Sequence, residues 1–93
     1  MNPEALLELA SVPRLIPHLL ERAHKAAQGD VELEAVSAFL PAFARCREVL
    51  SDESHFLAAT SGDAVKLDRL DLLSRVDEAE RALVLALRVN RDQ

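Results

Sequence analysis

Four prolines and two glycines divide this 93-residue chain into segments that are rich in leucine and alanine. The 17 Leu and 15 Ala are strong helix formers, whereas aromatic strand formers are scarce, with three Phe and no Trp or Tyr. This composition predicts an all-α fold, and the prolines and glycines mark where helices are interrupted or end. We expect a small helical bundle of three main helices plus a short N-terminal helix, in a single domain over residues 1–93.

The N-terminal segment carries the signals of a short helix. Asn2 can cap it, Pro3 occupies the first helical position, where its missing N–H costs nothing, and Glu4 favours the positive end of the helix dipole. The residue before Pro13 avoids the helical conformation. This helix should therefore end near Ser11.

The next segment, residues 11–28, has two prolines near its start. Either Ser11 caps a helix that Pro17 kinks in its second turn, or the regular helix begins at Pro17. We expect a bent start, then a helix to about Gln28 that Gly29 ends in the left-handed conformation. The helical period predicts one apolar side, which comprises Leu15, Leu19, Ala23 and Ala26, flanked by Ile16 and Leu20.

The opposite side of this predicted helix carries a basic ridge, made of Arg14, His18, Arg22 and Lys25 within an arc of roughly 80°. The ridge is the only concentration of positive charge in the sequence. It is either a docking strip for an acidic peptide or phosphates, or a solvated face that acidic neighbours partly neutralise. Glu21 can pair with Lys25 at the (i, i+4) spacing, and we favour the solvated face.

A third helix is predicted over residues 31–50, with Asp30 as its cap. Pro41 removes one backbone hydrogen bond from it and should either kink the helix or divide it. Cys46 lies at the edge of the apolar stripe between two arginines, which can lower a thiol pKa and make it reactive. We favour a small structural hydrophobe instead. The buried stripe should comprise Val36, Phe39, Leu40, Phe43 and Leu50.

Residues 51–63 are rich in Ser and Asp, which predicts a loop that holds about one helical turn and is pinned to the core by Phe56. The longest helix should then run from Ala64 to about Arg91. In its first half the predicted inward side is Val65, Leu72, Leu73, Val76 and Ala79, and the reverse side is Asp71, Ser74, Arg75, Asp77, Glu78 and Arg81.

From Ala82 onward this last helix is apolar on two opposite sides. Leu83 and Leu87 continue the core stripe, whereas Leu85 points directly away from it, with Val89 beside it. An apolar surface of this kind is unfavourable in water unless something covers it. Either the N-terminal helix covers it through its leucines, or a second copy or another protein packs on it. We favour association.

The sequence contains few motifs typical of metal, phosphate or nucleotide sites. Glu21 and His24 have the spacing that places two metal ligands on one helical face, but a di-iron bundle needs two such motifs. Two glycines are too few for a phosphate-binding loop or a dinucleotide fingerprint. We therefore expect no enzyme, and no metal, cofactor or small-molecule substrate.

Charge and cysteine content bear on the surroundings of the protein. A formal net charge of −5 argues against a general nucleic-acid or anionic-membrane surface. No apolar run is long enough to span a bilayer, and the acidic residues among the first ten are atypical of a signal peptide. A single cysteine fits a reducing compartment, so we expect the cytoplasm.

The function that these patterns favour is a non-enzymatic protein–protein interaction module, such as an adaptor, a dedicated chaperone or an assembly subunit. It should form a homo-oligomer, in the simplest case a dimer. The alternative is a small antitoxin-like regulator that contacts nucleic acid or an acidic partner through the basic ridge. The predicted self-contact consists of Leu83, Leu85, Leu87 and Val89.

Overall fold

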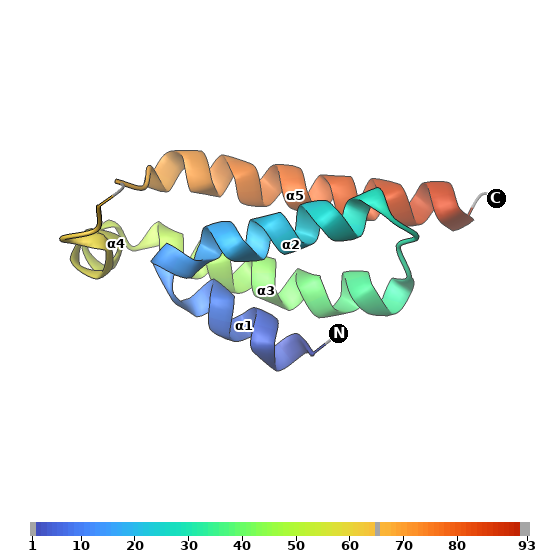
Figure 1. Cartoon of the computed structure of the whole chain (residues 1–93), viewed down its shortest axis with the longest axis horizontal. Helices are drawn as coiled ribbons and strands as arrows, with labels where there is room; N and C mark the ends of the chain where they lie inside the picture. The colour runs from blue at the N-terminus through green and yellow to red at the C-terminus, as the bar shows by residue number, and fades with distance from the viewer. Residues whose placement is uncertain (1, 65, 92–93) are drawn as a thin grey trace.

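Helical segments make up nearly all of the chain. The computed structural model describes residues 2–64 and 66–91, with side chains placed to residue 89. These residues form five α-helices and one 3-10 turn and contain no strand, so the predicted all-α bundle is confirmed (Figure 1). The elements are α1 (Pro3–Ser11), η1 (Pro13–Leu15), α2 (Ile16–Gln28), α3 (Leu33–Ser51), α4 (Glu53–Thr60) and α5 (Arg69–Arg91).

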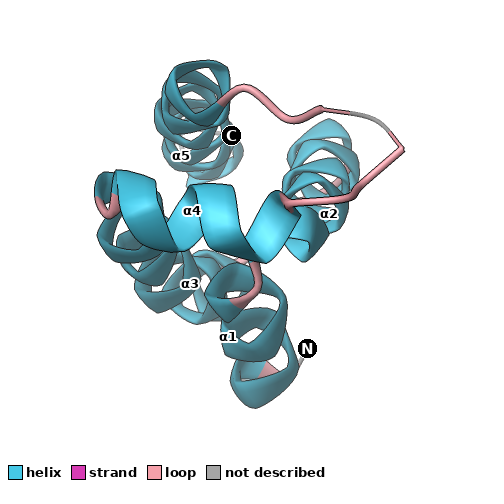
Figure 2. Ribbon diagram, turned by 90° about the vertical axis from the view of Figure 1, so that its left-hand side faces the viewer, coloured by secondary structure: helices cyan, strands magenta, loops and turns pink. Residues whose placement is uncertain are grey.

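Four helices form the sides of a bundle that is 47 Å along its longest axis. α3 packs between α1 and α5, and α2 packs against α5 and α1 (Figure 2). α4 crosses one end of the bundle, where it contacts η1 and α3. The short helix α1 and the long helix α5 consequently lie on opposite sides of the molecule.

The core is apolar throughout: no polar or charged residue is buried among those whose side chains are described. Phe39 and Phe43 stack at its centre with ring centroids 5.7 Å apart. None of the described helices has an apolar stretch long enough to cross a bilayer. The remaining large, fully buried side chains are Leu6, Pro13, Ile16, Leu19, Cys46, Leu50, Leu72, Val76 and Leu83.

The buried side of α3 matches the prediction at Val36, Phe39, Phe43 and Leu50. The prediction is wrong at Leu40, which is 39% exposed. Ala38 and Ala42 are buried instead. They lie on the far side of the buried stripe from Leu40, given about 100° per residue. The buried face of α3 is therefore shifted away from Leu40 toward these small residues.

The N-terminal prediction is confirmed in detail. The side chain of Asn2 accepts a hydrogen bond from the Glu4 amide at 3.0 Å and caps α1. The bent start of the second unit is the 3-10 turn η1, after which α2 begins at Ile16. Ser11 does not cap this unit, because it closes α1 and its hydroxyl donates to the Leu7 carbonyl.

The connection between α2 and α3 differs from the prediction at two residues. Gly29 has φ −103° and ψ −162°, which is extended rather than left-handed. Asp30 does not cap α3, because Glu32 is the residue that precedes the first helical turn. The extended chain between the helices buries Val31 in the core. Burial of this apolar side chain therefore takes precedence over the local capping signal.

Pro41 does not divide the third helix, since α3 is continuous from Leu33 to Ser51 with Pro41 inside it. The ring is exposed, whereas Phe39, Ala42 and Phe43 on either side of it are buried. Packing on both sides of the proline thus offsets the loss of one backbone hydrogen bond.

The segment predicted as a loop with about one turn is a two-turn helix, α4. The Asp52 side chain accepts from the His55 amide at 2.9 Å and caps it, while Phe56 is buried as predicted. α5 begins at Arg69 rather than Ala64, because Asp68 accepts from two amides of its first turn. The predicted inward position of Val65 lies outside the described residues.

Candidate functional site

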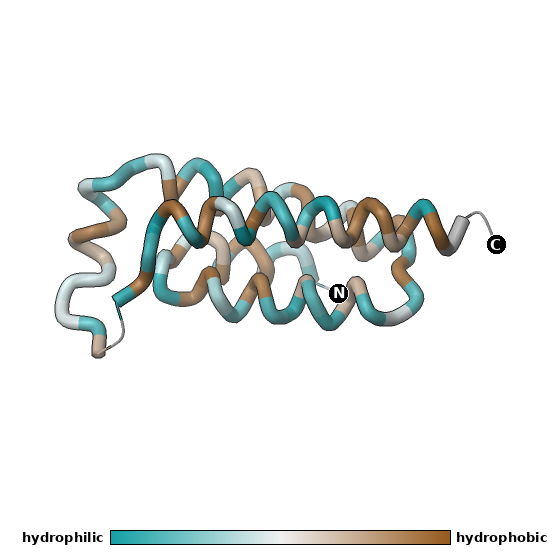
Figure 3. The backbone as a smooth tube through the Cα atoms, turned by 90° about the horizontal axis from the view of Figure 1, so that it is seen from above, coloured by the Kyte–Doolittle hydropathy of each residue, from teal (hydrophilic) through white to brown (hydrophobic). Residues whose placement is uncertain are grey.

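The outer face of α5 exposes apolar side chains near its C-terminal end. Leu85 is 62% exposed and Val89 is 50% exposed, whereas Leu83 is fully buried and Leu87 is half-buried. We call the surface formed by Leu85, Val89 and the exposed Ala82 the collar of α5. Figure 3 shows apolar residues becoming dense toward this end of the helix.

The collar has no cover within the described part of the chain. The alternative in which the N-terminal helix shelters it is wrong, because α1 packs on α3 and α2 at the far side of the bundle (Figure 2). The Leu6 side chain of α1 is buried in the core and so does not reach the collar. Leu85 and Val89 are therefore exposed among the described residues.

An ion-paired cluster ties α5 to α3 beside the collar. The Arg47 guanidinium donates to Asp77 Oδ1 from Nε at 3.0 Å and from Nη2 at 2.9 Å, and also to Glu80. The hydrogen bond from Arg47 to Glu80 is the main reason why the pKa of Arg47 is raised above its ordinary value. A neighbouring hollow of about 520 Å³ includes Leu85 and Arg88 in its lining.

The spacing of these residues in the sequence does not reveal the cluster. Arg47 precedes Asp77 by 30 positions and Glu80 by 33, and neither spacing falls within one helix. The only available signal was the opposite charge of the residues. Charge alone does not select one pair among nine Arg and sixteen acidic residues.

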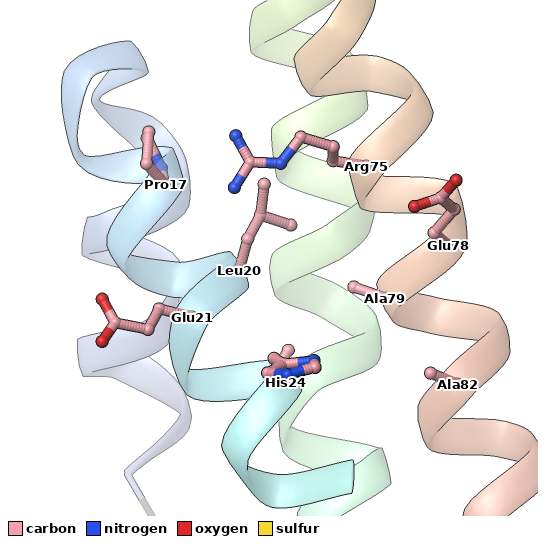
Figure 4. A pocket seen from close by; sticks show the side chains of 9 residues that line it. Pro17, Leu20, Glu21, His24, Arg75, Glu78, Ala79 and Ala82 are labelled. Carbon is pink, nitrogen blue, oxygen red and sulfur yellow. The ribbon is translucent and has the colours of Figure 1, made fainter.

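A groove of about 570 Å³ runs between α2 and α5 on the other flank of the collar. Its base is apolar, formed by Leu20 and by small residues such as Ala79 and Ala82. Figure 4 shows Arg75 reaching from α5 toward α2, and Glu78 of α5 is also part of the lining. The groove is continuous with the collar through Ala82.

All four residues of the basic ridge are exposed. Lys25 Nζ lies 3.5 Å from Glu21 Oε1, so the predicted pair forms. Both side chains are well exposed, and surface pairs of this kind contribute at most about 1 kcal/mol. Arg14 lies in η1 rather than in α2, so the ridge spans two elements.

Cys46 is fully buried on α3 rather than at the edge of the stripe. Desolvation by burial raises the pKa of its thiol to about 12, and the opposing effect of Arg47 is smaller. A reactive thiolate is therefore disfavoured here. The structural interpretation of Cys46 stands.

Each of the two candidate metal ligands, Glu21 and His24, lies beside another side chain. His24 Nε2 lies 3.0 Å from Gln28 Nε2, while Glu21 pairs with Lys25. Within residues 2–64 and 66–89, no three His, Cys, Asp or Glu side chains gather closely enough to hold a metal ion.

Comparisons of this chain with protein-family models, with curated proteins and with solved structures find no match. The exposed surfaces of the protein are therefore the features that bear on its function. Among them, the collar of α5 combines large apolar side chains with high exposure.

Proposed function

We propose that this protein is a non-enzymatic protein–protein interaction module that associates with itself through the collar of α5. The observation that carries the proposal is the exposure of Leu85 and Val89 on the outer face of α5. An adaptor, a dedicated chaperone or an assembly subunit would use such a surface. The single cysteine, a buried free thiol, favours placing the protein in the reducing cytoplasm.

The energetic argument rests on apolar area. Burial of apolar surface contributes about 25 cal/mol per Å², so covering two large side chains on each copy stabilises a complex by a few kcal/mol before the entropy of association is subtracted. A two-fold dimer covers the same patch on both copies at once. Self-association therefore removes both exposed collars with one contact.

The test is the oligomeric state measured by size-exclusion chromatography with light scattering. We expect the wild type to be dimeric at tens to hundreds of micromolar and Leu85→Asp to be monomeric, because the substitution places a charge in the contact. Leu57→Asp is the matched control: Leu57 is 60% exposed, but it lies on α4 at the opposite end of the bundle. This variant should remain dimeric.

Circular dichroism on each variant checks that the helices are retained. A wild type that stays monomeric throughout this concentration range would overturn the self-association proposal. Loss of the dimer in Leu57→Asp as well would also contradict it, because the contact would then not be located at the collar.

The second candidate is a small regulator that contacts nucleic acid or an acidic partner through the basic ridge. Three residues of the ridge, Arg14, His18 and Arg22, are exposed and have no ion pair within the described part of the chain. Binding through them should weaken steeply as salt is added, and Arg22→Glu should reduce it. Absence of binding to DNA, RNA or a polyglutamate peptide at low salt would exclude this candidate.

A further inference from the structure

The outer face of α5 carries a row of exposed residues at alternating spacings of three and four. This outer seam consists of Asp71, Ser74, Glu78, Arg81, Leu85 and Arg88. The row lies opposite the buried stripe, since Leu85 is about 200° from Leu83 around the helix. The same alternation places residues at the contact positions of a two-stranded coiled coil.

Charge is distributed unevenly along the outer seam. Its first half is acidic through Asp71 and Glu78, and its second half is basic through Arg81 and Arg88. None of these four side chains has an ion-pair partner among the described residues. In contrast, the acidic residues on the α3 side of α5 are paired with Arg47. Arg81 and Arg88 thus flank the exposed Leu85, and the two acidic residues lie farther toward the N-terminal end of the seam.

The orientation of a second helix on this seam decides whether these charges attract or repel. In a parallel pair each seam residue meets its own counterpart, which gives four layers of like charge. In an antiparallel pair centred between residues 79 and 80, alternate contact positions face each other. Glu78 then faces Arg81 of the second copy, and Asp71 faces Arg88 of the second copy. All four charged layers then pair opposite signs, and Leu85 packs over Ser74 of the second copy.

We propose that the occupant of the outer seam is a second copy of this chain, whose α5 packs antiparallel and in this register. The inference rests on the self-association proposed above and specifies its geometry. Charge complementarity carries it, because like charges facing each other across an interface are strongly unfavourable. The acidic half that complements the basic end belongs to the same helix, so no other protein is needed to supply it.

Charge exchange between Glu78 and Arg81 tests the register. Arg81→Glu places a second carboxylate against Glu78 of the other copy in two layers, and we expect the dimer dissociation constant, measured by analytical ultracentrifugation, to rise by about tenfold or more. Glu78→Arg should have the same effect. The double variant Glu78→Arg/Arg81→Glu restores opposite charges in both layers, so its dissociation constant should return to within about threefold of wild type.

Cysteine cross-linking provides a second measurement. In the proposed register Ser74→Cys/Leu85→Cys brings two engineered thiols together in each of two layers, and oxidation should yield a covalent dimer. Leu85→Cys alone should not cross-link, because the two residues at position 85 are 11 residues apart along the pair, about 16 Å. The native thiol does not compete, since Cys46 is buried.

The outcomes separate this inference from the proposed function. If Leu85→Asp abolishes the dimer while Arg81→Glu leaves it unchanged, or if the double charge variant fails to recover, self-association stands and the antiparallel register is wrong. Cross-linking through Leu85→Cys alone would likewise overturn the register in favour of a parallel pair. A monomeric wild type would overturn the self-association proposal, and the register with it.

Discussion

Cys46 and Arg47 are adjacent in sequence, yet they serve the fold in different ways. The Cys46 side chain points into the core, where no solvent reaches it. The Arg47 side chain points toward α5, where it binds Asp77 and Glu80. A neighbouring cation lowers a thiol pKa, but burial raises it, and at Cys46 the effect of burial is the larger. Packing therefore outweighs the charge next to it.

The raised pKa of Cys46 predicts a pH dependence of stability. The unfolded thiol loses its proton near its ordinary value of 9.0, whereas the folded thiol keeps it to about 12. The stabilisation is fully present below pH 9 and is lost as the pH rises from 9 toward 12. Removal of the thiol in Cys46→Ala should therefore make the fall in unfolding free energy over this range shallower, by up to about 1.4 kcal/mol per pH unit.

Urea unfolding between pH 8 and 11 measures this difference. The chain suits the experiment because it has no Tyr and only two Lys, so few other groups titrate in the same range. Cys46→Ala lowers stability at every pH by leaving a cavity, but the quantity compared is the slope. Equal slopes in the two proteins would contradict the prediction.

Among the helices, three begin at a side chain that accepts hydrogen bonds from the first turn. Asn2 does so for α1, Asp52 for α4 and Asp68 for α5. The Asp52 cap is the most consequential for the sequence interpretation, because it converts a Ser- and Asp-rich stretch into a helix. α4 in turn places Phe56 in the core at the end of the bundle.

Removal of the Asp52 cap should destabilise α4. We expect Asp52→Ala to lower the unfolding free energy by roughly 0.5–2 kcal/mol, because the His55 amide loses its acceptor. Asp52→Asn retains an acceptor oxygen and should cost less. Urea unfolding gives the free energies, and amide hydrogen exchange should accelerate first in residues 53–60. An Asn variant as unstable as the Ala variant would argue against a capping role.

The arrangement of the whole molecule leaves one face of its longest helix free. α2 and α3 occupy two flanks of α5, and α1 lies across the bundle from it (Figure 1). Small helical domains often gain stability by association. Dimerisation through α5 would therefore affect the stability of the entire bundle.

Linkage between association and folding predicts a concentration-dependent melting temperature. The Tm of the wild type should rise with protein concentration, because a dimer that forms only from folded chains shifts the unfolding equilibrium. Added salt should reduce the effect by screening the charges of the outer seam. Differential scanning calorimetry over a hundredfold concentration range measures both. Leu85→Asp should have a Tm independent of concentration, and a wild type that behaves the same way would contradict the prediction.

Several features that act over one or two helical turns follow from the sequence alone. The Asn2 cap, the bent start at η1, the burial of Phe39, Phe43 and Phe56, and the outward position of Leu85 all follow from spacings of a few residues. Helical periodicity fixes which side chains share a face. These predictions therefore needed no knowledge of neighbouring helices.

Which helix covers which face depends on contacts between segments that are far apart in the sequence. The exposure of Leu40, the extended chain that buries Val31, the pairing of Arg47 with α5 and the distance of α1 from the collar depend on contacts between remote segments. An apolar helix face is stable only when it is buried, but the face itself does not identify the helix that covers it. The arrangement of all helices decides which one covers each face, because a single arrangement must bury the apolar faces of all of them.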